Sequence, residues 1–185
     1  PLLEILKVIN KRSHNVYAEA VLRTVGRVAT GHGSVRGGAA AVAALLGESA
    51  PAAAGIHIDD GSGLSVRNRA SARSFVELLA FMEKSPHRDA YFETLPEAAV
   101  DRGLRRMQQT AAAGNLRAKT GTIDRVSSLS GYVRAANGEL LAFSIISNDV
   151  PSTWKAKRIE DRIGARLASF DRPAPTGRLA SSPTP

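Results

Sequence analysis

Residues 116–123 read Leu-Arg-Ala-Lys-Thr-Gly-Thr-Ile. Small and β-branched residues around the Lys-Thr-Gly predict a strand. The Lys119 ammonium attracts a carboxylate, the Thr120 hydroxyl can bond to one, and Gly121 lets a peptide backbone lie close. At a sheet edge, such a strand can pair with an extended peptide that ends in a free carboxylate. Three residues also match by chance, and alone they fit an ordinary exposed strand end equally well.

A second short motif, Ser13-His14-Asn15, lies about a hundred residues upstream. Ser-x-Asn alone occurs by chance in roughly every second or third chain of this size. Followed by Lys-Thr-Gly, however, it gives two of the three signature elements of penicillin-recognising serine acyl-enzymes, whose first element is Ser-x-x-Lys.

The surroundings of both motifs extend this pattern over most of residues 2–150. Three stretches resemble the D-alanyl-D-alanine carboxypeptidase/endopeptidase family of low-molecular-mass penicillin-binding proteins: residues 6–20, residues 60–69 and residues 118–133. The departures from the family pattern are His14, Arg102 and a glycine that is missing from the passage before Arg102. His14 stands where many members have an acidic or amide residue, and Arg102 interrupts an Asp-Gly-Thr-Leu-like passage.

The resemblance implies an α/β (α+β) fold of the β-lactamase/transpeptidase-like type, in which helices flank an antiparallel sheet. The chain is expected to be an incomplete C-terminal portion of it. Residues 1–114 would form a helical part that carries Ser-x-Asn. Residues 115–170 would add antiparallel strands with Lys-Thr-Gly and a C-terminal helix to the same domain, and residues 171–185, rich in Pro, Ser and Thr, would form a disordered tail.

Local patterns predict the elements in more detail. Apolar spacing predicts helices over residues 2–11, 15–26 and 104–112, and Ser34 and Ser71 are expected to cap two more. Ser13 is expected to be an N-cap between the first two helices, and residues 91–96 to be turns. Asn137-Gly138 predicts the hairpin of a three-strand meander. The last helix is expected to pack on the sheet through an apolar face made of Trp154, Ile159, Ile163 and Leu167.

The resemblance also assigns roles to the motif residues. Ser13 would relay protons toward the leaving nitrogen, and Asn15 would hydrogen-bond the substrate amide and steady the catalytic lysine. Lys119, Thr120 and Gly121 would hold the terminal carboxylate. The Thr122 backbone N–H would supply half of the oxyanion hole, and Ile123 would line the pocket for the penultimate side chain of the substrate. This chemistry requires no metal or cofactor, and the four scattered histidines suggest no metal site.

The nucleophile is not found where the family order places it. No Ser-x-x-Lys precedes Ser13. The one literal match, residues 152–155, follows a proline, where serine is an expected N-cap. The nucleophile is therefore expected on an N-terminal part of the same protein, and the chain alone is expected to be inactive.

Composition narrows the possible partners. No apolar run approaches the roughly 20 residues that span a bilayer, and the +8 net charge comes from scattered arginines with few aromatics between them, which argues against nucleic acid. A basic surface suits an anionic polymer such as the cell wall. The resemblance implies peptidoglycan stem peptides as substrates, β-lactams as covalent inhibitors, and a place in the cell envelope, periplasmic or extracellular.

Two other functions remain open at this point. A serine β-lactamase shares both motifs but needs a base for deacylation. Glu48 lies near the class A spacing, yet the asparagine of such a loop is missing. A non-catalytic peptidoglycan-binding fragment is the second alternative. Asp60, the one carboxylate in the glycine-rich passage that invites a catalytic role, is expected to be a structural turn residue.

Overall fold

The computed structural model describes residues 1–50 and 55–172, so most of the predicted tail lies outside the described residues. The described part is an α+β fold with one antiparallel sheet in the order β1-β2-β3. In chain order its elements are α1 (Leu2–Arg12), α2 (Asn15–Thr30), α3 (Val35–Ser49), α4 (Ala72–Lys84), α5 (Arg88–Thr94), the 3-10 helix η2 (Arg102–Leu104), β1 (Arg117–Ile123), β2 (Val126–Arg134), β3 (Leu140–Ser147) and α6 (Thr153–Ala168). The predicted class and the three-strand meander are confirmed.

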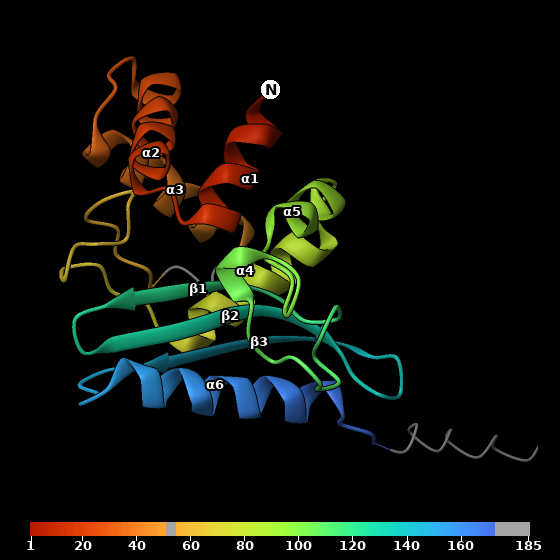
Figure 1. Ribbon diagram of the computed structural model, residues 1–185. Coiled ribbons are helices and arrows are strands. Elements are labelled where there is room, and N and C mark those ends of the chain that lie inside the picture. The colour runs from red at the N-terminus through yellow and green to blue at the C-terminus, as the bar shows by residue number, and fades with distance from the viewer. Residues whose placement is uncertain (51–54, 173–185) are drawn as a thin grey trace, which may run out of the picture.

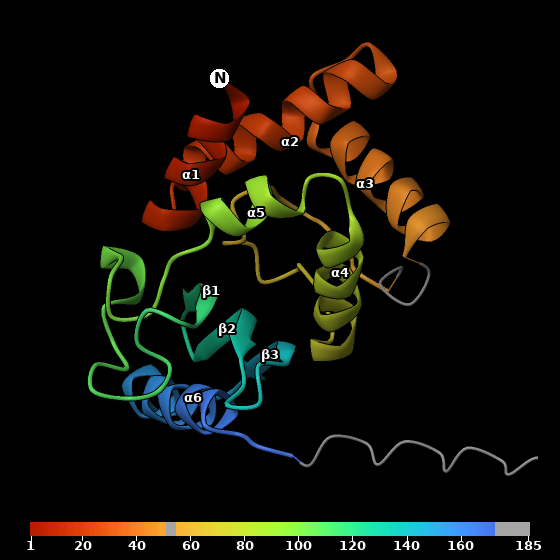
Figure 2. The same cartoon turned by 90° about the vertical axis from the view of Figure 1, so that its right-hand side faces the viewer.

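The elements are stacked in layers on the two faces of the sheet. Figure 1 shows α6 lying along one face, with the other helices on the opposite side. In the perpendicular view of Figure 2, α4 lies nearest that opposite face, and α1, α2 and α3 lie farther out. The Tyr132 hydroxyl joins two of these layers, because it donates a 2.7 Å hydrogen bond to the Leu79 carbonyl of α4.

The main core lies between the sheet, α6 and the segment that precedes β1. Its completely buried members include Leu116, Leu129 and Val133. A second cluster joins Leu79, Leu95 and Tyr132 under α4 and α5. The sheet that carries Lys-Thr-Gly is therefore packed on both faces.

The face of α6 that meets the sheet is not the predicted one. Trp154 and Ile159 are 62% and 56% exposed, whereas the buried residues of the helix are Ala156, Glu160, Gly164 and Ala168. The reason is that bulky residues from outside the helix already fill the space beneath it. A Cβ on Gly164 would lie 2.9 Å from Leu116 Cδ1 and 3.0 Å from Met107 Sδ. Of the four predicted contact residues, Leu167 does pack against this core.

The helical part differs from expectation in three places. Helix α2 does not end at Gly26 but runs to Thr30, and the glycine inside it lets α3 approach closely, since a Cβ there would lie 2.5 Å from Ser34 O. Residues 104–112 are not a helix, since Met107 and Gln109 have φ of 66° and 59°. The segment predicted as turns, residues 91–96, instead begins inside α5, which runs to Thr94.

The predicted caps are confirmed at three of four positions. The side chains of Ser34, Ser71 and Ser152 accept hydrogen bonds from the first turns of α3, α4 and α6. Ser13 is not an N-cap. It is the C-cap of α1, in the left-handed conformation at φ 51° and ψ 52°, and His14 caps α2.

Candidate active site

Ser13 and Lys119, which are 106 positions apart in the sequence, meet in space. Lys119 Nζ donates a hydrogen bond to Ser13 Oγ and a second one, of 2.6 Å, to the Thr120 carbonyl. The first bond joins the helical layer to β1. It brings the Ser-x-Asn and Lys-Thr-Gly motifs into one site, as the order of the two motifs predicted.

The tight link between α1 and α2 is what presents Ser13. Its left-handed conformation reverses the chain after α1, and a residue with a Cβ adopts this conformation only where its surroundings require it. Asn15 is the first residue of α2 and is exposed. The two polar side chains of the motif therefore lie at one corner of the helical layer.

His14 has a role in this link that the sequence did not reveal. Its Nδ1 accepts a 3.3 Å hydrogen bond from the Tyr17 N–H, and the two rings lie with their centroids 4.0 Å apart. The residue that departs from the family pattern thus caps α2 and fixes the direction in which the helix leaves Ser13.

The environment of Lys119 changes how easily it gives up a proton. Burial lowers the pKa of the Lys119 ammonium below its ordinary value, because the charged form loses hydration. Among the residues that the structure describes, no carboxylate forms an ion pair with this ammonium. A desolvated cation of this kind is suited to an incoming carboxylate, and it also donates a hydrogen bond to Ser13.

The outer edge of β1 is available to a peptide beyond Ala118. The Ala118 N–H donates outward to the Pro96 carbonyl, on the side away from β2. In an antiparallel pair successive residues direct their backbone groups to opposite sides, so Thr120 and Thr122 also present theirs outward. The Thr122 N–H therefore points away from β2, toward the outer edge of β1. Ile123 follows as the last residue of β1, paired with Val126 and partly buried.

Gly121 also leaves room within the sheet itself. A Cβ at this position would collide with the hydroxyl of Ser128, its partner on β2. The glycine therefore makes room for its own sheet, on the face that also carries Lys119. Thr120 lies on the opposite face by strand alternation, where it lines a cavity together with residues of α6 and of the segment before β1.

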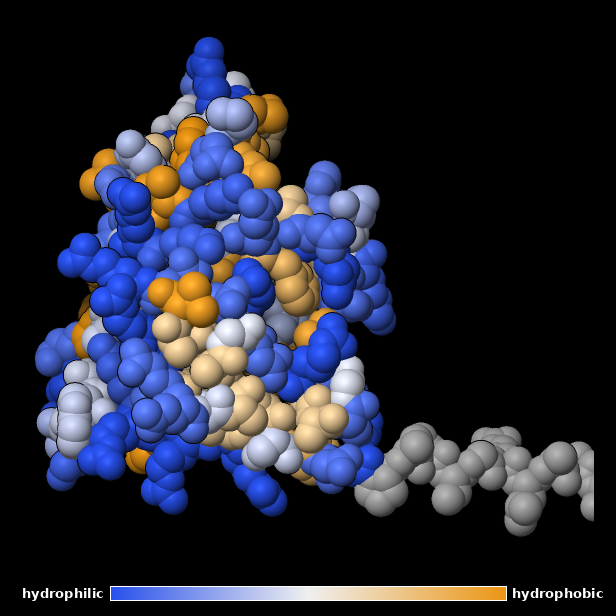
Figure 3. Space-filling view, turned by 45° about the vertical axis from the view of Figure 1, so that its right-hand side comes forward, coloured by the Kyte–Doolittle hydropathy of each residue, from blue (hydrophilic) through white to orange (hydrophobic). Residues whose placement is uncertain are grey.

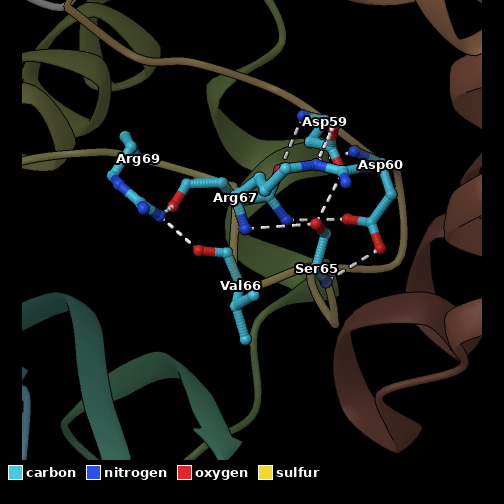
Figure 4. A network of polar contacts seen from close by, with 7 residues as sticks. Asp59, Asp60, Ser65, Val66, Arg67 and Arg69 are labelled. Atoms are coloured by element: carbon cyan, nitrogen blue, oxygen red, sulfur yellow. Dashed lines mark hydrogen bonds and ion pairs between the residues drawn. The ribbon is translucent and has the colours of Figure 1, made fainter.

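The loop that carries Asp60 is held by a dense polar network, part of which Figure 4 shows. The Asp60 carboxylate accepts hydrogen bonds from the side chains of Ser62 and Asn68 and from two backbone N–H groups. Burial alone would raise the pKa of Asp60, but these bonds together lower it below its ordinary value. All of these contacts serve the turn itself, as expected for a structural turn residue.

Ser152 lies on the other side of the sheet from Ser13 and Lys119. It caps α6, where its Oγ accepts a 3.4 Å hydrogen bond from the Lys155 N–H. In Figure 1, α6 and the helical layer occupy opposite faces of the sheet. The literal Ser-x-x-Lys match therefore begins the helix that covers the face of the sheet opposite the helical layer.

No group of three or more His, Cys, Asp or Glu side chains in residues 1–50 and 55–172 is placed to hold a metal ion. Over the same residues, no helix combines the length and the apolar character that crossing a bilayer requires.

Comparison with known proteins places the site in a family. Residues 1–170 match the profile of the D-Ala-D-Ala carboxypeptidase 3 (S13) family. The chain belongs to this family.

Relatives with curated names agree with this placement. The chain is 37% identical over 175 residues to a D-alanyl-D-alanine carboxypeptidase of Actinomadura sp. (strain R39), covering 91% of this chain and 32% of the relative. It is 30% identical over 147 residues to a D-alanyl-D-alanine carboxypeptidase of Haemophilus influenzae, covering 77% of this chain and 31% of the relative. The chain thus spans about a third of the length of these relatives.

Solved structures show the same fold. Penicillin binding protein 4 from Haemophilus influenzae, in complex with a β-lactam, superposes with a TM-score of 0.81 at 25% identity and covers 92% of this chain and 42% of that one. A predatory endopeptidase from Bdellovibrio bacteriovorus superposes with a TM-score of 0.72 at 26% identity, covering 91% and 45%. The predicted β-lactamase/transpeptidase-like architecture is confirmed.

Proposed function

We propose that this chain supplies the Ser-x-Asn and Lys-Thr-Gly elements of a serine-type D-Ala-D-Ala carboxypeptidase/endopeptidase that acts on peptidoglycan stem peptides. The observation that carries the proposal is the hydrogen bond from Lys119 Nζ to Ser13 Oγ, which joins the two motifs. Membership of the S13 family supports it.

The proposed reaction proceeds through an acyl-enzyme. A serine hydroxyl attacks the D-Ala-D-Ala amide carbonyl, the C–N bond breaks, and the terminal D-Ala leaves as an amine. Water then hydrolyses the ester and restores the serine. The nucleophile and its lysine lie on another part of the same protein, as the greater length of the relatives allows.

The residues of this chain act on the substrate at five points. Lys119, with Thr120 and Gly121, binds the terminal carboxylate. The outward Thr122 N–H donates to the oxyanion, and Ile123 lines the adjoining pocket. Ser13 passes a proton to the leaving amine, which its hydrogen bond to Lys119 favours because Lys119 can return a proton to Ser13 Oγ. Asn15, at the same corner, donates to the substrate amide and steadies the catalytic lysine.

The same geometry accounts for inhibition by β-lactams, which present a carboxylate beside an acylating carbonyl. One structural neighbour is a penicillin binding protein that was solved with a bound β-lactam. Action on peptidoglycan would place the protein in the cell envelope, periplasmic or extracellular.

The first test uses the intact parent protein. Lys119→Ala is expected to weaken both D-Ala-D-Ala peptide hydrolysis and penicillin acylation by about tenfold to a hundredfold, since a charged hydrogen bond contributes about 1.5–3 kcal/mol. Ser13→Ala is expected to lower kcat more than it raises KM, because a proton relay acts mainly in the transition state. An unchanged acylation rate in the first variant, or a raised KM with unchanged kcat in the second, contradicts the assigned roles.

Two further measurements separate the alternatives. Rapid nitrocefin turnover by the intact parent would identify a β-lactamase, and binding of D-Ala-D-Ala peptides without hydrolysis would identify a binding fragment. The 185-residue chain alone is expected to form no covalent adduct with a fluorescent penicillin, because Ser152 caps α6 and lies behind the sheet. A stoichiometric adduct that Ser152→Ala abolishes would show that Ser152 is a nucleophile.

A further inference from the structure

The outer face of helix α6 has a composition that a solvated helix face does not usually show. Helix α6 is the outermost element on its side of the sheet, and its outer face is turned away from the rest of the molecule (Figure 1). The exposed residues of the helix are Trp154, Lys155, Arg158, Ile159, Arg162, Ile163 and Arg166. All of them are either cationic or large and apolar, and none is acidic. A solvated face usually carries small polar residues and charges of both signs.

The exposed apolar side chains of α6 cannot turn inward, because the packing beneath the helix fixes its rotation. On the inner face, a Cβ on Gly164 would lie 2.9 Å from Leu116 Cδ1, so no larger residue fits there. One turn away, the buried Glu160 carboxylate accepts 2.6 Å hydrogen bonds from Arg106 and Ser127. The exposure of the tryptophan and the two isoleucines is therefore a fixed feature of the folded chain.

The cations on this face are not neutralised by the protein. Over residues 1–50 and 55–172, no ion pair includes any of the four. Both acidic residues of α6 contact Arg106 instead, Glu160 at 2.6 Å and Asp161 at 3.3 Å. The rest of the chain carries no acidic side chain. Every fourth residue brings another arginine, which makes a row with a spacing of roughly 6 Å along the helix, namely Arg158, Arg162 and Arg166.

The surface of a membrane that contains anionic phospholipid matches both kinds of residue. Each Lys or Arg near such a surface is attracted by its negative potential, and a guanidinium group matches the oxygens of a lipid phosphate. Tryptophan is enriched at the membrane–water interface, where its ring is in apolar surroundings and its N–H stays hydrated. The Arg158 guanidinium lies 5.0 Å from the centroid of the Trp154 ring, so both groups would enter the headgroup layer together.

Other partners match this face less completely. A soluble polyanion would bind the cations but would leave Trp154, Ile159 and Ile163 in water. A second copy of the chain would place the same cations opposite one another, since a two-fold interface pairs a patch with itself. A bilayer surface can take up both kinds of side chain, as it does with interfacial helices that combine Lys and Arg with Trp and other apolar residues.

We propose that the outer face of α6 is a peripheral membrane-binding surface that recognises anionic phospholipid. The four cations lie at the level of the lipid phosphates, and the tryptophan and isoleucines enter the interface beside them. Ser13 and Lys119 meet between the sheet and the helical layer, on the opposite side of the sheet from α6 (Figure 1). The candidate active site therefore stays accessible while α6 faces the bilayer. Membrane binding of this kind does not require the catalytic activity proposed above.

The fluorescence of Trp154 reports on this face directly, because Trp154 is the only tryptophan of the 185-residue chain. The chain is titrated with vesicles of phosphatidylglycerol and phosphatidylcholine in equal amounts, with pure phosphatidylcholine vesicles, and with soluble polyphosphate. A blue shift of the emission, together with co-sedimentation, is expected with the anionic vesicles alone, since the indole leaves water there. Both effects should weaken as the salt concentration is raised, because salt screens the cations.

Two double variants with the same loss of charge make the test specific. Arg158→Gln with Arg162→Gln removes two cations of this face, and the vesicle partition coefficient is expected to fall roughly tenfold to thirtyfold. Arg36→Gln with Arg73→Gln changes two exposed residues of α3 and α4, on the other side of the sheet (Figure 2). Partitioning of this control is expected to stay within about twofold. Circular dichroism and thermal unfolding that match the wild type establish that both variants fold.

Absence of partitioning into anionic vesicles overturns the proposal, and so does partitioning without a blue shift, which would mean that another surface holds the lipid. Equal weakening of both double variants would mean that only net charge matters. An equal blue shift with polyphosphate would identify a soluble polyanion as the partner, against the proposal.

The same sedimentation is repeated with the intact parent protein, which is expected to bind the anionic vesicles and to lose binding in the Arg158→Gln, Arg162→Gln variant. A parent that stays in the supernatant would mean that the rest of the protein covers this face, and the proposal would fail. Hydrolysis of D-Ala-D-Ala peptides by the parent in lipid-free buffer tests the proposed function separately, so either proposal can fail without the other.

Discussion

The two layers that meet at the candidate active site are held together in different ways. The layer that carries Lys119 has a dense core in which Leu116, Leu129 and Val133 are 0% exposed. In the layer that carries Ser13, helix α1 has no buried residue, and Val28 of α2 is 83% exposed. In Figure 3, hydrophobic atoms reach the surface of this helical layer among hydrophilic ones.

Helix α1 is attached mainly through polar side chains. Asn10 donates a 2.7 Å hydrogen bond to Thr94, Lys7 pairs with Glu93 at 2.6 Å, and Lys11 pairs with Asp101 at 3.0 Å. Partly exposed ion pairs contribute little free energy each. The position of Ser13 relative to Lys119 thus depends on a helical layer that is less firmly packed than the sheet. Variants in the two layers should therefore affect stability to different extents.

The largest effect is expected from the buried ion pair that fixes α6 to the sheet layer. Arg106→Met would leave the Glu160 carboxylate, which is 0% exposed, with only the 2.6 Å hydrogen bond from Ser127. The free energy of unfolding is expected to fall by about 3–5 kcal/mol in urea denaturation. The double variant Arg106→Met with Glu160→Met should recover much of this loss, because the completely buried carboxylate is then removed, although Asp161 still loses its contact with Arg106. A single variant that loses less than about 1 kcal/mol would show that the pair does not hold this layer.

Close glycine contacts allow the two layers to be disturbed separately. A Cβ on Gly131 would collide with the Arg117 carbonyl of β1, and one on Gly38 would collide with the Leu22 carbonyl of α2. Each alanine variant is expected to lose about 1–3 kcal/mol. Hydrogen exchange should show protection lost throughout the chain for Gly131→Ala, but mainly in α2 and α3 for Gly38→Ala.

Gly47→Ala is the matched control, because a Cβ there meets nothing within 4 Å. It should stabilise α3 by about 0.5–1 kcal/mol. Equal loss of protection in both layers for Gly38→Ala would mean that the helical layer and the sheet unfold as one unit.

A smaller and local effect is expected at the link between α1 and α2. His14→Ala removes the side-chain cap of α2 and should cost about 1 kcal/mol, seen as faster amide exchange in the first turn of the helix. His14→Asn should restore protection, since asparagine is a strong N-cap. If both variants exchange as slowly as the wild type, the histidine does not hold the helix start.

The smallest effect concerns Lys119 and depends on pH. Burial lowers the pKa of Lys119 in the folded protein, while the unfolded chain keeps the ordinary value of 10.5. At pH values between the pKa of Lys119 in the folded protein and 10.5, the unfolded state binds more protons than the folded state. The contribution of Lys119 to the free energy of unfolding therefore rises with pH in this range and is most unfavourable below it. Lys119→Met should therefore unfold at a slightly higher temperature than the wild type at pH 7. This difference in unfolding temperature should shrink as the pH approaches 10.5. A difference that widens would contradict a lowered pKa of Lys119 in the folded protein.

The sequence alone determined the parts of the molecule that depend on nearby residues. The strand around Lys119, the Asn137-Gly138 hairpin and the caps at Ser34 and Ser71 were all predictable. These features need only a short pattern of side chains and a local hydrogen bond. The two motifs also indicated that Ser13 and Lys119 belong to one site, because their order matched a known signature.

The tertiary structure decided the features that depend on distant residues. The inner face of α6 follows Gly164 rather than Ile159, because Leu116 and Met107 occupy the space where a larger side chain would lie. The predicted helix over residues 104–112 is absent because positive φ angles at Met107 and Gln109 turn the chain there. The cavity at Thr120 likewise arises only when α6 folds against the stretch before β1. In each case the deciding contact joins residues that no local pattern relates, since packing is settled only when the layers come together.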